Sequence, residues 1–109
     1  MVAKGIKRLI LVTATHHPHH RMFIKLLNKL VKELKVEKEI KSEDYLFLIE
    51  HGETDEFGMA WIPQLLAELE DGSIKPILTK MPFDKSLKPD LEEAYKQCLS
   101  KLKDLGAIE

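Results

Sequence analysis

The junction at residues 13–21 (T-A-T-H-H-P-H-H-R) constrains the fold most, because the hydrophobic pattern changes its period there. Before it, residues 6–12 are a nearly continuous apolar run, which is typical of a strand buried on both faces. After it, apolar residues recur every three or four positions through residues 22–34, which predicts an amphipathic helix. Pro18 suits the first turn of this helix, since the N–H that proline lacks would be unpaired there. We therefore expect a central strand that leads through an exposed loop into a helix.

Residues 45–49 (Y-L-F-L-I) are a second apolar run, and this pattern predicts a second strand. The polar segment at residues 35–44 would connect it to the first helix. A helical crossover between two strands of one sheet makes them parallel. Residues 54–60 are enough only for a short or irregular helix, with Thr54 as its cap.

Residues 64–69 fit a helix by residue preference, but the Asp71-Gly72 pair that follows favours a strand. Asp-Gly is a strong signal for a two-residue hairpin turn, and residues 74–79 would return from it as the fourth strand. Pro76 removes a backbone donor from that strand, so we expect the strand at an edge of the sheet.

The last predicted element is an amphipathic helix that begins after Pro89 and ends near Gly106. A loop at residues 81–88 would precede it. Cys98 lies on the apolar stripe of this helix, where a small buried hydrophobe is the expected role.

Composition limits the possible classes of protein. A chain of 109 residues, 44% of them hydrophobic, fits a single domain over residues 1–109 with one core, after a polar lead-in at residues 1–5. The net charge of -1 provides no field that would favour nucleic acid or a membrane, so neither is an expected partner. One cysteine and the lack of a signal-like or membrane-length apolar segment predict a soluble, cytoplasmic protein.

In this order of elements the chain resembles the thioredoxin and glutaredoxin superfamily, from about residue 5 to residue 105. Residues 17–20 (H-P-H-H) stand where those families carry a Cys-Pro-x-Cys motif, with both cysteines replaced by histidine. Residues 62–63 (I-P) match the dipeptide before the third strand whose proline is cis and faces that motif. Residues 71–72 (D-G) match the turn of the family's hairpin. The resemblance implies a βαβαββα α/β fold, with a four-stranded mixed sheet in the order 2-1-3-4 and helices on both faces.

That fold would gather the ends of the first, second and fourth strands and the start of the third on one rim of the sheet. All five histidines and the segment at residues 80–83 would lie there. We expect this rim to bind a protein or a small ligand through His16, His17, Pro18, His19, His20, Arg21, His51, Trp61, Ile62 and Pro63. In the family, the residue before the cis-proline offers backbone groups to an extended peptide, so the resemblance implies that Trp61 and Ile62 flank a peptide groove.

Thiol chemistry is not expected despite this resemblance. Disulfide exchange requires a thiolate that attacks sulfur, and histidine supplies none. We therefore expect no disulfide oxidoreductase activity, and we assign no catalytic residue.

A metal-binding role is the first alternative for the same histidines. Neutral imidazole is the commonest transition-metal ligand, so His17, His19, His20 and His51 could hold Zn, Ni or Cu. An anion on the free N–H groups of residues 18–21 is a related possibility, with Arg21 beside it.

A phosphate-handling enzyme is another alternative. Residues 46–54 (L-F-L-I-E-H-G-E-T) are similar to the strand and Arg-His-Gly-Glu-Thr signature of the histidine phosphatases, with His51 in the place of the nucleophile. Glu50 replaces the arginine, and its negative charge would repel phosphate. A homo-oligomer formed through an exposed edge strand also stays open.

Overall fold

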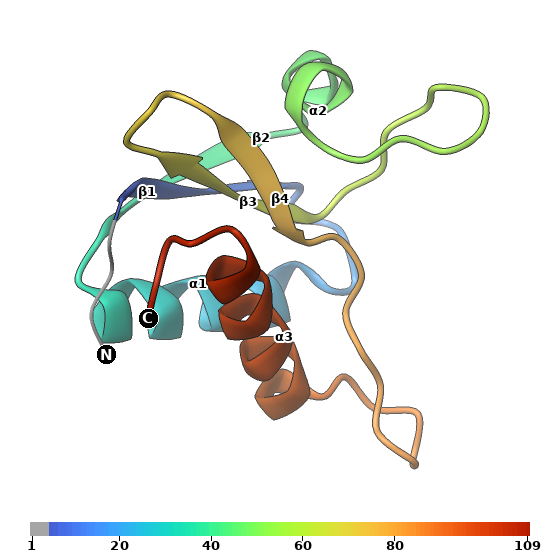
Figure 1. The fold of residues 1–109 in the computed structure, drawn as a ribbon. Coiled ribbons are helices and arrows are strands. Elements are labelled where there is room, and N and C mark those ends of the chain that lie inside the picture. The colour runs from blue at the N-terminus through green and yellow to red at the C-terminus, as the bar shows by residue number, and fades with distance from the viewer. Residues whose placement is uncertain (1–4) are drawn as a thin grey trace.

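The computed structural model describes residues 5–109, so most of the predicted lead-in, residues 1–4, lies outside it. Its elements are β1 (Ile6–Thr13), α1 (His20–Leu34), β2 (Glu37–Ser42), α2 (Tyr45–His51), β3 (Gln64–Leu69), β4 (Ile74–Leu78) and α3 (Leu91–Asp104). The strands form one mixed sheet in the order β2-β1-β3-β4 (Figure 1). β1 is parallel to β2, and β3 is antiparallel to both of its neighbours. The predicted α/β class, element order and strand order are therefore confirmed.

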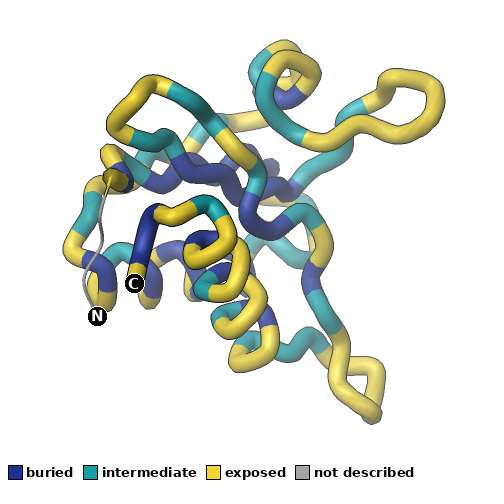
Figure 2. The backbone as a smooth tube through the Cα atoms, viewed as in Figure 1, coloured by how far each residue is buried: buried dark blue, intermediate teal, exposed yellow. Residues whose placement is uncertain are grey.

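β1 is central because it has apolar side chains on both faces. Leu9 and Leu11 belong to the larger core cluster, between the sheet and the layer of α1 and α3, whereas Ile10 and Val12 pack with Leu48 of α2. All four β1 side chains are at most 2% exposed. Figures 1 and 2 show the result, with α1 and α3 below the sheet, α2 above it, and the buried chain between them. Full burial of such a side chain stabilises the fold by about 1.5–3 kcal/mol.

α1 follows the predicted amphipathic pattern but begins before residue 22. Two turns precede it, in which the N–H of His17 donates to the Ala14 carbonyl and the N–H of His20 donates to the His17 carbonyl. Pro18 lies within these turns and not in the first turn of the helix, so that prediction is wrong. α1 is the longest helix at 15 residues, and no helix in residues 5–109 is long and apolar enough to cross a membrane.

The second strand lies at Glu37–Ser42, and the prediction of a strand at residues 45–49 is wrong. Within residues 5–109, β2 pairs only with β1, so a charged sequence suits its exposed position at the edge of the sheet. Residues 45–51 form α2 because the Asp44 carboxylate caps the helix, accepting a hydrogen bond from the Phe47 N–H at 3.1 Å. Within this helix only Leu48 is fully buried.

The prediction of a short helix at residues 54–60, with Thr54 as its cap, is also wrong. The segment is a loop closed by a β-bridge between Thr54 and Ala60. The Asp55 carboxylate accepts hydrogen bonds from the N–H groups of Phe57 and Met59, at 2.9 and 3.0 Å. An aspartate that satisfies backbone donors in this way stabilises a turn in preference to a helix.

The hairpin and the last helix lie where they were predicted, but residues 70–73 separate the two strands, so the turn is longer than the two residues expected. Asp71-Gly72 turns the chain between β3 and β4, and Gly72 adopts a φ of 91°, which glycine accepts without steric cost. Pro76 lies in β4 at the edge of the sheet. Gly106 follows α3 with a φ of 72°, in the left-handed region used at helix ends.

The attachment of α2 can be tested with two leucines of the same helix. Leu48→Ala should lower the free energy of unfolding by about 2–5 kcal/mol, because a fully buried leucine leaves a cavity. Leu46→Ala should change it by less than about 0.5 kcal/mol, because Leu46 is 76% exposed. Urea unfolding followed by Trp61 fluorescence measures both values, and equal losses would contradict this packing.

Candidate functional site

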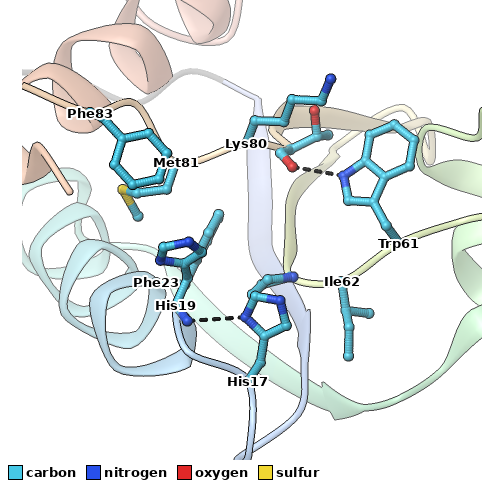
Figure 3. Close-up of a pocket in the computed structure, with 10 residues that line it drawn as sticks. His17, His19, Phe23, Trp61, Ile62, Lys80, Met81 and Phe83 are labelled. Atoms are coloured by element: carbon cyan, nitrogen blue, oxygen red, sulfur yellow. Dashed lines mark hydrogen bonds between the residues drawn. The ribbon is translucent and has the colours of Figure 1, made fainter. Parts of the chain in front are cut away.

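A groove of about 290 Å³ lies on the rim where β1 and β4 end and β3 begins (Figure 3). Its walls are mostly apolar and come from four parts of the chain. They are formed by His17, His19, Phe23, Trp61, Ile62, Pro63, Thr79, Lys80, Met81 and Phe83. The fold prediction placed residues 17–19, 61–63 and 80–83 on this rim, and the structure brings them together there.

His17 is held in place by the turn that it belongs to. Its Nδ1 accepts a hydrogen bond from the backbone N–H of His19 at 3.0 Å. The neutral ring must then carry its proton on Nε2, which leaves a donor for a ligand. Burial lowers the pKa of His17, and the neighbouring charges of His19, His16 and His20 lower it further. At neutral pH this side chain is therefore an uncharged hydrogen-bond donor.

His19 and Phe83 form one side of the groove. Their ring centres are 5.6 Å apart in an edge-to-face arrangement, and the His17 ring lies 5.6 Å from that of His19. Phe83 is 52% exposed, so the ring offers much of its surface to a ligand.

Trp61 and Lys80 form the opposite side. The indole N–H of Trp61 donates to the Thr79 carbonyl at 2.8 Å, which ties the segment before β3 to the end of β4. Lys80 places its Nζ 5.5 Å from the centre of the Trp61 ring, within range of a cation–π contact. Figure 3 shows both side chains across the groove from Phe83.

Ile62 and Pro63 also line the groove and are joined by a cis peptide bond, as predicted. Within residues 5–109, neither the N–H nor the carbonyl of Ile62 takes part in a hydrogen bond. Ile62 therefore brings two free backbone groups to the groove.

Gln64 positions this part of the rim, and the sequence analysis did not identify it. It is fully buried, its Nε2 donates to the carbonyls of Glu53 and Trp61, and its Oε1 accepts from the Glu53 N–H, all at 2.9 Å. Gly52 makes room for the amide, because a Cβ there would lie 2.6 Å from Gln64 Oε1. The available signal was a polar residue at the start of an apolar strand.

Five of the predicted rim residues lie outside the groove, namely His16, Pro18, His20, Arg21 and His51. Pro18, His20 and Arg21 line a separate hollow of about 440 Å³ beside the start of α1. Nδ1 of His20 is 3.0 Å from the Thr13 hydroxyl, which attaches this ring to the end of β1. His16 is exposed and lines neither space.

His51 is not at the end of a strand, because residues 45–51 are helical. Its ring packs on Phe47 of the same helix at 4.9 Å, and its Nε2 is 3.7 Å from a carboxylate oxygen of Glu50. The prediction that His51 lies at the end of the second strand is therefore wrong. The strand that a histidine phosphatase signature requires is also missing at this position.

The metal interpretation gains no support from the arrangement of the donors. Over residues 5–109, no group of three or more His, Cys, Asp or Glu side chains is arranged to hold a metal ion. His17 and His20 each engage Nδ1 in a local contact, and His51 belongs to α2.

Comparison with protein-family models, with curated proteins and with solved structures gives no match to this chain.

The role of Gln64 can be tested against a second glutamine. Gln64→Ala should lower the free energy of unfolding by about 2–4 kcal/mol, because three hydrogen bonds are lost at a buried position. Gln97→Ala should cost less than about 0.5 kcal/mol, because its one hydrogen bond, to Glu93, is exposed. Urea titrations of both variants provide the comparison, and a neutral Gln64→Ala would refute the positioning role.

Cys98 should be chemically inert in the folded protein. Burial raises the pKa of this thiol to about 12, so almost no thiolate is present at pH 8 to attack a reagent. A colorimetric disulfide reagent should give no measurable reaction with native protein and one equivalent in concentrated urea. Rapid reaction of the native protein would contradict the burial of Cys98.

Proposed function

We propose that this chain is a thioredoxin-like protein without thiol chemistry, which binds an extended peptide segment in the groove beside Ile62. The βαβαββα order of elements, the strand order β2-β1-β3-β4 and the cis Ile62-Pro63 bond on the rim support the thioredoxin-like assignment. The groove supports the binding role, because it is open, mostly apolar and lined from both sides of the rim.

The residues at the positions of the family's cysteines argue against redox chemistry. His17 and His20 stand there, and Cys98 lies buried in α3, away from the groove lining. Since disulfide exchange needs an accessible thiolate, the rim is left with binding as its role.

The free backbone groups of Ile62 are the observation on which the proposal rests. An extended peptide can pair its own N–H and carbonyl with those of Ile62, as a strand does at the edge of a sheet. This pairing does not depend on the side chains of the peptide, so the walls of the groove must supply specificity. Phe83 and Trp61 provide two aromatic surfaces for an apolar anchor on the peptide.

Charge should bias the choice of peptide. Lys80 is the charged residue of the groove lining, His17 presents an N–H donor, and no carboxylate in residues 5–109 lines the groove. A peptide with an acidic residue next to its apolar anchor would therefore be preferred, and its affinity should fall as the salt concentration rises.

Selection from a random twelve-residue peptide library on the purified protein tests the proposal. Enriched peptides should carry an apolar residue beside an acidic one. In fluorescence anisotropy, Phe83→Ala should weaken their binding by about tenfold or more, because the groove loses an aromatic wall. Leu87→Ala is the matched control, since Leu87 lies on the same loop, is 82% exposed and does not line the groove.

Equal affinity of the wild-type protein and Phe83→Ala for every enriched peptide would contradict the proposal, as would a selection that enriches no peptide. Loss of binding on truncation of Leu46 or Ile49 would instead assign the peptide to the exposed side of α2.

A further inference from the structure

The two edges of the sheet differ in their capacity to pair with another strand. β4 contains Pro76, which has no N–H to donate. β2 contains no proline and, within residues 5–109, pairs only with β1. Its outward backbone groups are therefore available. β2 also has the charged sequence E-K-E-I-K-S, and the placement of these charges decides whether they repel a further strand or select one.

The charges of β2 on the α2 side belong to a row of alternating sign. Lys41 Nζ lies 3.1 Å from Glu39 Oε2 and 4.9 Å from the centre of the Phe47 ring in α2. Arg8 of β1 continues the row, with Nη1 3.4 Å from Glu39 Oε1 and Nε 3.1 Å from Glu68 Oε1 in β3. The row crosses three strands and stops at the outer edge of the sheet, at Glu39 and Lys41.

The other side of β2 offers an apolar residue. Lys38 marks this side, because its Nζ donates to Asn28 Oδ1 of α1 at 2.6 Å. Ile40 lies on the same side by the alternation of the strand, opposite Leu11 in the parallel register, and is 48% exposed.

We propose that this chain forms a homodimer in which β2 pairs antiparallel with β2 of a second copy, about a two-fold axis at Ile40. In this register Ile40 lies opposite its own copy, and Glu39 of each chain lies opposite Lys41 of the other. The two sheets become one, with α2 of both copies on the same side. The row of alternating charges then continues from one chain into the next.

The charges favour this register over its neighbours. Residues directly opposite each other in an antiparallel pair must point to the same face, so the register can shift only in steps that preserve the faces. A pairing centred on Glu39 would place Glu39 opposite its own copy, and one centred on Lys41 would do the same with Lys41. Both arrangements put like charges in contact at their centre, and neither brings the two copies of Ile40 together. The one centred on Glu39 does set Glu37 opposite Lys41, but it leaves each Ile40 opposite Lys38. The register centred on Ile40 pairs opposite charges, and the strand that complements β2 is β2 itself.

Sedimentation equilibrium of charge-reversed variants tests this dimer. The wild-type protein should dimerise, and Glu39→Lys or Lys41→Glu alone should raise the dimer dissociation constant by about tenfold or more. An equimolar mixture of the two variants should dimerise again, because one chain is positive at both positions and the other is negative at both. Glu56→Lys and Lys85→Glu are matched controls on exposed loops and should dimerise like the wild type. Circular dichroism checks that each variant is folded.

A wild-type protein that stays monomeric at about 1 mM would overturn the proposal. So would dimers that neither reversal weakens, or a mixture of the two variants that stays monomeric.

Cysteine cross-linking provides a second test that does not alter charge at the ion pair. Ile40→Cys should give a covalent dimer on mild oxidation, because opposite residues have Cα atoms about 4.5–5.5 Å apart, within disulfide range. Lys38→Cys should not, because the two copies of residue 38 would lie about 13 Å apart along the strands. The native Cys98 is buried, so it does not compete with the introduced cysteine for disulfide formation. Equal cross-linking of the two variants, or none with Ile40→Cys, would contradict the register.

Discussion

Apolar side chains on both faces of β1 require a cover above and below the sheet, and the two covers differ in size. α1 and α3 bury one face with a large cluster, whereas α2 covers the other with Leu48 as its one fully buried residue. The chain leaves the sheet for the larger layer through the histidine turns after β1, and it comes back to the sheet from α2 through Trp61 and Pro63 before β3. The groove lies between these two passages. The position of the candidate site therefore follows from the way in which α1, α3 and α2 cover the two faces of β1.

The parts of the fold that the sequence predicted are those with one dominant local signal. A continuous apolar run identified β1, a three-to-four spacing identified α1, and Asp71-Gly72 with Pro76 identified the hairpin and its edge strand. The second strand was misplaced because two signals competed there. The apolar run at residues 45–49 looked like a buried strand, but the cap at Asp44 makes it a helix, and the charged residues 37–42 form the strand. A strand at the edge of a sheet needs little apolar surface, so its sequence carries no apolar pattern from which the strand could be predicted.

The site was predictable to the extent that it depends on strand order. Once β1, β3 and β4 were placed, the meeting of residues 17–19, 61–63 and 80–83 followed. The directions in which individual side chains point could not be predicted from the strand order. His20 faces the Thr13 hydroxyl, and Gln64 reaches the backbone of Glu53 across a loop. Each of these contacts joins groups whose approach depends on the completed fold, and no spacing in the sequence encodes it.

The groove and the outer edge of β2 have one feature in common, which is backbone N–H and carbonyl groups that the fold leaves without hydrogen bonds. In the groove, the free groups of Ile62 lie beside aromatic walls that limit what can approach them. At β2 they belong to a whole strand, and the order of Glu39 and Lys41 limits the approach instead. In both proposals, side chains supply the selectivity.

The most direct measurement of the central claim is a chemical-shift map of the 15N-labelled protein as a groove-binding peptide is added. We expect the amides of Ile62, Lys80 and Phe83 and the indole N–H of Trp61 to shift, while those of Tyr45, Leu46 and Ile49 on α2 do not. Shifts that gather on α2 and leave the Ile62 amide unchanged would contradict it.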